Sequence, residues 1–246
     1  FEAEQYVPFS IEDVNLDFQI LGPKEEPGQM DVILVAVKKD TINEYVNAVR
    51  EAGLNPIIVD VNHFALENMY EINYEIEPIK NVAIVNIGAS TINMNILKGG
   101  ISVFTRDSAV GSNLHTEALQ REFNLTYENA ERLKRGEPIE NIPPEDAFSI
   151  MDLASEEIID DISRSFEFYR STELHEDINE VIVSGGCALI KDFPKHLSEK
   201  VGIETKVIEP FKNIKISQKF DSSYMEEIAP IAAVATGLAL RRQGDR

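Results

Sequence analysis

A glycine-centred turn in the middle of the chain has the composition of a phosphate-binding loop. It follows the apolar run 82–85 and contains Gly88, Ala89, Ser90 and Thr91. Because Gly88 has no Cβ, the backbone can approach an anion closely, and the amides and hydroxyls that follow can donate hydrogen bonds to phosphate oxygens. The turn therefore predicts contact with the phosphates of a nucleotide.

Two further features could hold the nucleoside. Glu131 and Lys134 share one face of a polar helix, where the carboxylate could bind ribose hydroxyls and the lysine stem could lie along the base. Gly185 and Gly186 follow the apolar run 181–183 and open a turn whose bare backbone could lie against a base or an α-phosphate. Taken singly, each feature is more often an ordinary turn or a solvated ion pair. Their joint occurrence in this order predicts one shared site.

The elements that must position these residues follow from apolar periodicity. Strands are expected at 15–21, 30–37, 57–61, 81–86, 92–97, 101–105, 181–183 and 204–208, and helices at 42–53, 62–70, 113–123, 126–136, 144–174, 194–202 and 230–240. A charged turn at 23–28 joins the first two strands into a hairpin. The first sixty residues thus predict a compact α+β unit, and the chain as a whole is expected to be α/β.

Composition excludes several classes of function. The chain has 246 residues, 43% hydrophobic content and a net charge of −20, so a sizeable core is expected and nucleic acid is not an expected partner. Four histidines show no metal-ligand spacing, so no directly bound metal is expected, and the lone Cys187 excludes an intramolecular disulfide. No stretch is long and apolar enough to span a bilayer, and the acidic N-terminus is not a signal peptide. We therefore expect a cytoplasmic protein without direct membrane insertion.

The aromatic cluster in the helix expected at 144–174 is interpreted as core. Phe166, Phe168 and Tyr169 are expected to pack inside rather than to form a stacking platform. Cys187 is expected to be a small buried residue and not a nucleophile. No residue is assigned a catalytic role.

At these residues the chain resembles the actin-like ATPase superfamily, and within it the PilM family of type IV pilus assembly proteins, which is related to the cell-division protein FtsA. VNIGASTINMNILKGG is similar to the second phosphate loop and its hairpin, GSNLHTEALQREFNLTYENAERLKRG to the helix pair with the nucleoside-contacting A-E-x-x-K segment, VIVSGGCALI to the adenosine motif, ATGLALR to the closing helix, and FEAEQYVPFSIEDVNLDFQIL to the edge of the small 1C subdomain. The resemblance covers essentially the whole chain. It implies an actin-like (ribonuclease H-like) ATPase domain with an α+β 1C subdomain.

The resemblance also implies a subdomain plan. Residues 1–60 correspond to 1C, 61–80 to a remnant of 1A and a connector, 81–120 with 180–246 to 2A, and 121–179 to 2B. Because the chain opens at Phe1 in mid-pattern without a methionine, we expect an N-terminally truncated fragment that lacks the family's first phosphate loop. We expect ATP with Mg²⁺ in the complete protein, and a weak or empty site in this fragment.

Two amides stand where the superfamily usually has carboxylates. Asn86 precedes the phosphate loop where Asp is usual, and Asn62 lies at a strand-end position often held by Glu. An amide can hold a water, so Asn86 could contact a magnesium-bound water, but an amide can neither act as a general base nor neutralise Mg²⁺. We therefore expect weak ATP hydrolysis or none.

The resemblance implies an ATP-binding scaffold of the inner-membrane assembly complex of type IV pili. Its partner would be the cytoplasmic N-terminal tail of a PilN-like membrane protein, held in a groove that involves the 1C unit and linking the scaffold to the inner membrane. Self-association is left open. An FtsA-like division ATPase is one alternative, disfavoured because residues 240–244 form no amphipathic lipid-binding helix. A metabolite kinase is the other, disfavoured because it would need a carboxylate where Asn62 and Asn86 stand.

Overall fold

The computed structural model describes residues 3–23, 29–172, 176–242 and 244. The chain divides into two compact units, Phe1–Val59 with Arg241–Arg246, and Asp60–Leu240. Each unit is described by itself. The finer division of the second unit into 1A, 2A and 2B parts stays a prediction.

The first unit is a long hairpin followed by a helix. Its elements are η1 (Ala3–Gln5), η2 (Ile11–Asp13), β1 (Val14–Pro23), β2 (Met30–Lys38) and α1 (Lys39–Glu51). The two strands pair antiparallel, with an irregularity between Ile20 and Gly22. The turn expected at 23–28 falls, from residue 24 onward, outside the described residues. Val7 and Val14 are the buried apolar side chains among those described in this unit, so its core is very small.

The strand expected at 57–61 is wrong. The chain from residue 54 to residue 61 has no regular structure, and Ile57 is 71% exposed. A short run of β-branched apolar residues favours a strand only where a neighbouring strand can receive its backbone hydrogen bonds. No strand of the described residues pairs with this segment.

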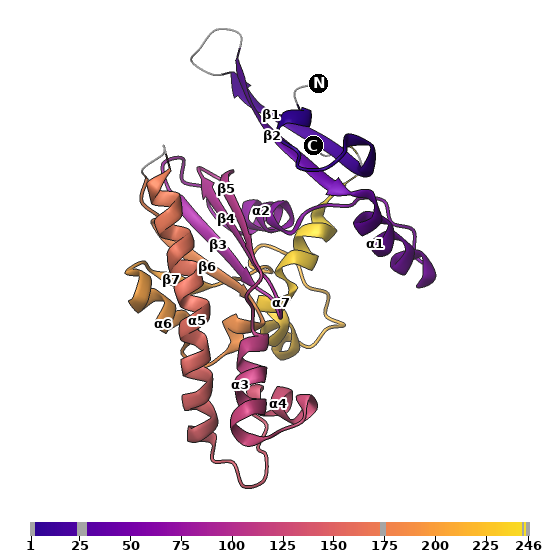
Figure 1. Cartoon of the computed structure of the whole chain (residues 1–246). Coiled ribbons are helices and arrows are strands. Elements are labelled where there is room, and N and C mark those ends of the chain that lie inside the picture. The colour runs from indigo at the N-terminus through magenta and orange to yellow at the C-terminus, as the bar shows by residue number, and fades with distance from the viewer. Residues whose placement is uncertain (1–2, 24–28, 173–175, 243, 245–246) are drawn as a thin grey trace. The chain divides into compact units, whose positions relative to one another are not determined.

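The second unit is built on a five-stranded sheet with the order β5-β4-β3-β6-β7 (Figure 1). The strands are β3 (Asn81–Ile87), β4 (Ile92–Lys98), β5 (Ile101–Ser108), β6 (Glu180–Gly185) and β7 (Thr205–Val207). β3, β4 and β5 form the expected antiparallel meander, whereas β6 lies parallel to both β3 and β7. In the β3–β6 register Ile87 lies opposite Gly185. Because β3 and β6 are parallel, the Gly88 turn and the Gly185–Gly186 turn lie at the same end of the sheet, where both strands finish.

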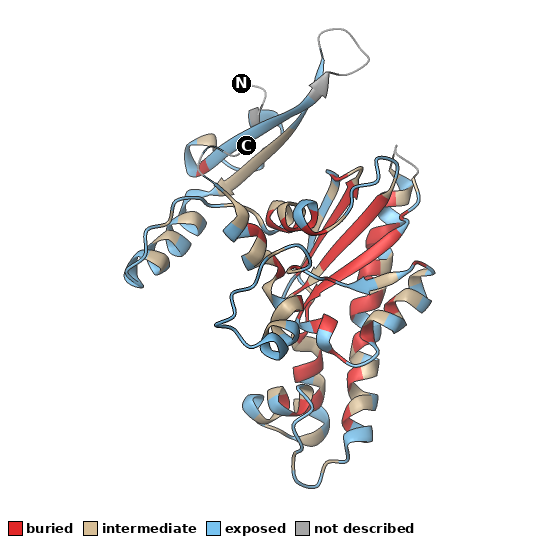
Figure 2. Cartoon of the chain, turned by 180° about the vertical axis from the view of Figure 1, so that it is seen from behind, coloured by how far each residue is buried: buried red, intermediate tan, exposed pale blue. Residues whose placement is uncertain are grey.

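Helices cover both faces of this sheet. They are α2 (Asn62–Asn73), α3 (Asn113–Phe123), α4 (Tyr127–Lys134), α5 (Pro144–Ser171), the short η3 (Gly186–Leu189), α6 (Phe193–Val201) and α7 (Ser222–Leu240). Val85 of β3 belongs to the core shared with α3, α5 and α6, while Ile84 belongs to the core shared with α2 and α7. Figure 2 shows the buried residues running through the sheet and along the inner sides of these helices.

α7 begins earlier than the sequence pattern predicted. The expected start was Pro230, but the helix starts at Ser222, where the Asp221 carboxylate accepts from the Tyr224 N–H at 3.0 Å. The first two turns mix apolar residues with two serines and two glutamates and show no apolar stripe, so periodicity missed them, although an Asp before two serines is a recognisable N-cap. α7 packs closely on α2, since a Cβ at Gly237 would lie 1.7 Å from the Ala65 carbonyl oxygen.

The aromatic residues of α5 are buried, as expected, with one exception. Phe166 and Tyr169 are buried, but Phe168 is 56% exposed, so the prediction of a buried Phe168 is wrong. Residues 166 and 169 are three apart and share the inner face of the helix. Phe168 lies at the side of this face, with its ring centroid 6.0 Å from that of Phe104. The helix ends at Ser171, and the expected end at 174 lies outside the described residues.

Candidate functional site

The glycine-centred loop is fixed to the start of α3. The Ser112 N–H donates to the Gly88 carbonyl at 2.9 Å, and the Asn113 N–H donates to the Ala89 carbonyl at 2.8 Å. Gly111 permits this approach, because a Cβ there would lie 2.5 Å from the Ala89 oxygen. The loop is therefore held by backbone hydrogen bonds rather than by its own side chains.

The same loop keeps unused donors. Its turn is closed by the Gly88 N–H, which donates to the Thr91 carbonyl at 2.9 Å, and Ala89, Ser90 and Thr91 are exposed. Among the described residues no backbone hydrogen bond is donated by the N–H of Ala89 or Ser90. Two adjacent free N–H groups in a turn suit an anion such as a phosphate.

The Gly185–Gly186 turn lies beside this loop. Gly185 has a φ of 83°, and a Cβ there would lie 2.2 Å from the Ile87 oxygen, so this position requires glycine. A Cβ at Gly186 would meet the Ser112 Oγ at 3.9 Å and nothing nearer. The backbone of Gly186 is thus open, next to the residue that anchors the Gly88 loop.

Glu131 and Lys134 form a part-buried cluster with Thr116 of α3. The Thr116 hydroxyl donates to Glu131 Oε1, and Lys134 Nζ donates to Thr116 Oγ1 at 2.8 Å and to Glu131 Oε1 at 2.5 Å. The side chains of Lys134 and Glu131 are only 13% and 18% exposed, so this is not a solvated pair. Burial by itself would raise the pKa of Glu131, but the hydrogen bonds from Lys134 and Thr116 outweigh it and lower the pKa. Glu131 Oε2 makes a longer contact, 3.9 Å to the Arg135 guanidinium.

The three sequence features therefore meet around the first turns of α3. Ser112 contacts the Gly88 loop and lies nearest to Gly186, and Thr116, four residues further on, holds Lys134. The charge of Lys134 also acts on Cys187, the residue after Gly186, although burial dominates there and raises the thiol pKa to about 12. Cys187 is fully buried and is not a nucleophile.

Three contributors at the start of this helix, Gly111, Ser112 and Thr116, were not singled out from the sequence. Ser112 is the N-cap residue, although its side chain makes no cap hydrogen bond. A serine and a threonine spaced four apart at the start of a helix share one face. That spacing was the available signal, but the partners of these residues come from distant parts of the chain.

The two amides at carboxylate positions meet on a third amide. Asn93 Oδ1 accepts from Asn62 Nδ2 at 3.1 Å and from Asn86 Nδ2 at 3.2 Å, and Asn93 Nδ2 donates to Asp107 Oδ1 at 2.6 Å. Asn86 Oδ1 accepts from the Ser184 hydroxyl at 3.0 Å. Asp107 is the carboxylate of this network and was not singled out from the sequence. Among the described residues, Asp107 is linked to Asn86 through Asn93.

The described part of the chain offers neither a metal centre nor a membrane-spanning helix. Within residues 3–23, 29–172, 176–242 and 244, no group of three or more His, Cys, Asp or Glu side chains is arranged to hold a metal ion. No helix in the described part of the chain combines the length and apolar character needed to cross a bilayer.

Comparison with known proteins agrees with this architecture. A solved PilM-PilN type IV pilus biogenesis complex matches with 29% identity and a TM-score of 0.83, over 98% of this chain and 69% of that chain. EutJ from Carboxydothermus hydrogenoformans matches with 18% identity and a TM-score of 0.60, over 87% of this chain and 62% of its own. MreB5 of Spiroplasma citri bound to ADP matches with 18% identity and a TM-score of 0.57, over 83% and 65%. At this identity the last two matches establish the fold alone.

These structures place the chain among actin-like ATPases in fold, as the sequence motifs predicted. The chain spans between 62% and 69% of the length of these three solved chains. A sequence model of the family described as type IV pilus assembly protein PilM matches residues 1–243. The protein therefore belongs to the PilM family of type IV pilus assembly proteins.

Proposed function

We propose that this protein is an ATP-binding, actin-like scaffold of type IV pilus assembly that hydrolyses ATP weakly or not at all. The observation that carries the proposal is the convergence of the Gly88 loop, the Glu131–Lys134 pair and the Gly185–Gly186 turn on the first turns of α3. This place offers free N–H groups and an open glycine side by side. A nucleotide would use both.

Each part of the site has a proposed role. The free N–H groups of Ala89 and Ser90, with the hydroxyls of Ser90 and Thr91, would bind the phosphates. Gly186 would lie against the base, and Glu131 Oε2 would accept from the ribose hydroxyls, with the Lys134 stem beside them. ATP would supply the phosphoanhydride bond. Bound Mg²⁺ would neutralise the phosphate charge, and Asn86, which retains one lone pair and one N–H, could contact a magnesium-bound water.

Slow turnover follows from the amide network. A general base must accept a proton from the attacking water, and Asn62 and Asn86 cannot do so at neutral pH. Asp107 can, but it is linked to Asn86 through Asn93, whose amide donates to Asp107 Oδ1 at 2.6 Å. The proposed site therefore binds and positions ATP without a base in contact with the water.

The proposed partner is the cytoplasmic N-terminal tail of a PilN-like membrane protein. Support comes from membership of the PilM family and from the similar solved chain, which is part of a PilM-PilN complex. Such a tail would hold the protein at the cytoplasmic side of the inner membrane without a spanning segment of its own. We propose that the α+β unit of residues 1–59 contributes to the groove.

Nucleotide titration tests the site. A fluorescent ATP analogue with Mg²⁺ should bind the wild-type protein saturably, and Gly186→Val and Lys134→Met should each weaken binding. Lys195→Met is the matched control, because Lys195 pairs with Glu199 at 3.8 Å on the exposed face of α6. Far-ultraviolet circular dichroism of each variant verifies folding. Equal affinities for the wild type and both site variants would remove the nucleotide site.

Peptide titration and phosphate release test the other two parts separately. A labelled PilN-like N-terminal tail should bind the protein saturably, and absence of binding would remove the partner while leaving the nucleotide site intact. The wild-type protein should release phosphate from ATP no faster than the Gly186→Val variant does. A clearly faster wild-type rate would contradict the slow-turnover part alone.

A further inference from the structure

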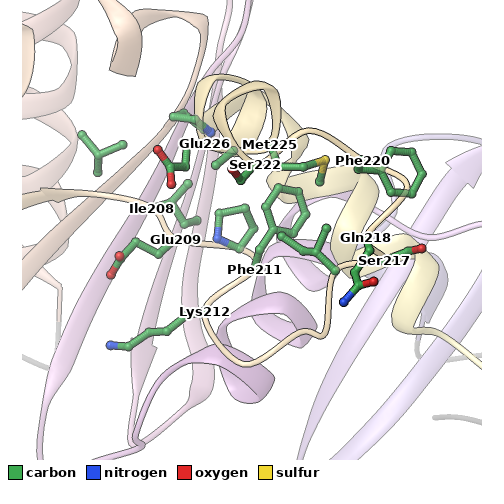
Figure 3. Close-up of a pocket in the computed structure, with 15 residues that line it drawn as sticks. Ile208, Glu209, Phe211, Lys212, Ser217, Gln218, Phe220, Ser222, Met225 and Glu226 are labelled. Carbon is green, nitrogen blue, oxygen red and sulfur yellow. The ribbon is translucent and has the colours of Figure 1, made fainter.

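A second concavity lies within the second unit and has a lining of its own. It has a volume of about 590 Å³ and is lined by residues between Val207 and Pro230, from the end of β7 to the middle of α7 (Figure 3). None of the nucleotide-site residues lines it. Ligand pockets in proteins occupy roughly 300–1,000 Å³, so this volume is large enough for a specific ligand.

The floor of this cavity is apolar. Its apolar side chains include Ile208, Phe211, Ile216, Phe220 and Met225, and Figure 3 shows Phe211, Phe220 and Met225 around the hollow. Phe220 is 58% exposed and Ile216 is 37% exposed. Exposed aromatic and aliphatic groups gathered in a concavity favour an occupant that brings its own apolar side chains.

The wall of the cavity is fixed to α2. The Glu209 N–H donates to the Tyr74 hydroxyl at 2.7 Å, and the Asn213 N–H donates to Asn73 Oδ1 at 2.9 Å. Asn213 Nδ2 also donates to the Ile72 carbonyl at 3.0 Å. These bonds fix the loop that lines the cavity to the end of α2, and a fixed lining lowers the entropic cost of binding.

Two carboxylates at the rim of the cavity can accept hydrogen bonds from an occupant. Glu209 and Glu226 line it, and neither carboxylate forms an ion pair with any residue that the structure describes. Lys212 also lines the cavity, and its Nζ lies 5.4 Å from the centroid of the Tyr74 ring. Pro230 has no N–H, so the Glu226 carbonyl lacks its donor at i+4.

We propose that this cavity docks a segment of a partner protein whose apolar side chains are flanked by lysine or arginine. The apolar side chains would fill the floor, and the cationic groups would donate to Glu209 and Glu226. The net charge of −20 would attract such a segment and repel an acidic one. This inference does not depend on the proposed nucleotide or PilN-like partner.

The test uses a fluorescein-labelled peptide of leucine and lysine, titrated by fluorescence anisotropy into the whole protein. Saturable binding is expected, and Glu226→Lys should weaken it by about tenfold, the cost of losing one close charge pair. Glu227→Lys is the matched control, because Glu227 neighbours Glu226 on α7, is also exposed and does not line the cavity. Its effect should stay within about twofold. Equal effects of the two variants would mean non-specific attraction and would overturn the proposal.

A second arm tests the floor and the other occupants. Phe220→Ala should weaken the peptide without unfolding the protein, since Phe220 is already 58% exposed. A peptide with glutamate in place of lysine should bind only the Glu209→Lys/Glu226→Lys double variant. Sedimentation showing a dimer that Phe220→Ala dissociates would assign the face to a second copy. Displacement of the peptide by a neutral detergent monomer at equal concentration would assign it to an uncharged ligand, and either result would overturn the proposal.

Discussion

Gly185 and Gly186 stand side by side at the end of β6 and differ in what surrounds their Cα atoms. Gly185 has positive φ and faces the Ile87 carbonyl, whereas Gly186 has open space beyond Ser112 Oγ at 3.9 Å. The first glycine serves the fold, because no side chain fits between β6 and β3 there. The second leaves backbone accessible, which a ligand could use.

This difference predicts a large loss of stability for one alanine variant and a small change for the other. Gly185→Ala should lower the free energy of unfolding by roughly 2–5 kcal/mol, since positive φ and overlap with Ile87 both oppose a Cβ. Gly186→Ala should change it by less than about 1 kcal/mol. Urea unfolding followed by circular dichroism measures both. Similar losses for the two variants would contradict the account of this turn.

His115 predicts how acid acts on stability. It is fully buried, its ring nitrogens lie 3.3 Å from the Ser112 carbonyl and 2.9 Å from Ser155 Oγ, and burial lowers its pKa to about 4. The charge of Lys134 acts in the same direction, while the Ser112 hydrogen bond opposes it. Between pH 6.5 and 4 the unfolded chain binds a proton at this histidine that the folded protein does not. Stability should therefore fall as the pH falls through that window, by about 3 kcal/mol.

The measurement is urea unfolding at several pH values between 7.5 and 4 for the wild type and His115→Gln. The variant should show a shallower fall above pH 4.5, because the glutamine cannot take up the proton. Carboxylate titration is common to both proteins and cancels in the comparison. Identical pH slopes would show that His115 is not held neutral by burial.

At the scale of elements, apolar periodicity predicted most of the second unit and failed where a partner or a cap decided the outcome. β3 and β6 were predicted correctly because each is a short apolar run that the sheet buries. The run at 57–61 has the same composition but meets no neighbouring strand among the described residues. The first turns of α7 depend on the Asp221 cap, and a search for apolar periodicity cannot detect a cap.

The contact between α3 and α4 predicts a contrast between two lysines. Lys134→Met keeps the aliphatic stem but removes the ammonium that serves Thr116 and Glu131, so it should cost about 1–3 kcal/mol of stability. Lys195→Met removes an exposed partner of Glu199 and should change stability by less than about 0.5 kcal/mol. Thermal and urea unfolding compare the two variants. Equal small changes would mean that the α3–α4 cluster adds no stability.

At the scale of the molecule, the candidate site was predictable as a set of pieces but not as a geometry. Gly88, Glu131 and Gly186 could be chosen because their types and order suit a nucleotide. Ser112 and Thr116 could not be, since their importance lies in contacts with residues far away in the sequence. Asn93 was missed for the same reason: only the folded sheet brings Asn62 and Asn86 to one amide.

The two units should also differ in local stability. Val7 and Val14 are the buried apolar side chains described for the first unit, whereas every residue of β6 is buried. Local opening is easier where few apolar contacts must be broken. Hydrogen exchange followed by mass spectrometry should therefore show amides of β1 and β2 exchanging much faster than those of β3 and β6. Comparable protection of the hairpin and the central strands would contradict this expectation.

The same exchange measurement, repeated with and without saturating ATP and Mg²⁺, tests the central claim most directly. If one nucleotide occupies the place where the three segments meet, exchange should slow together in peptides covering residues 88–91, 131–134 and 185–187, and Gly186→Val should abolish all three effects. Protection confined to one of these segments, or none in any of them, would contradict a shared nucleotide site.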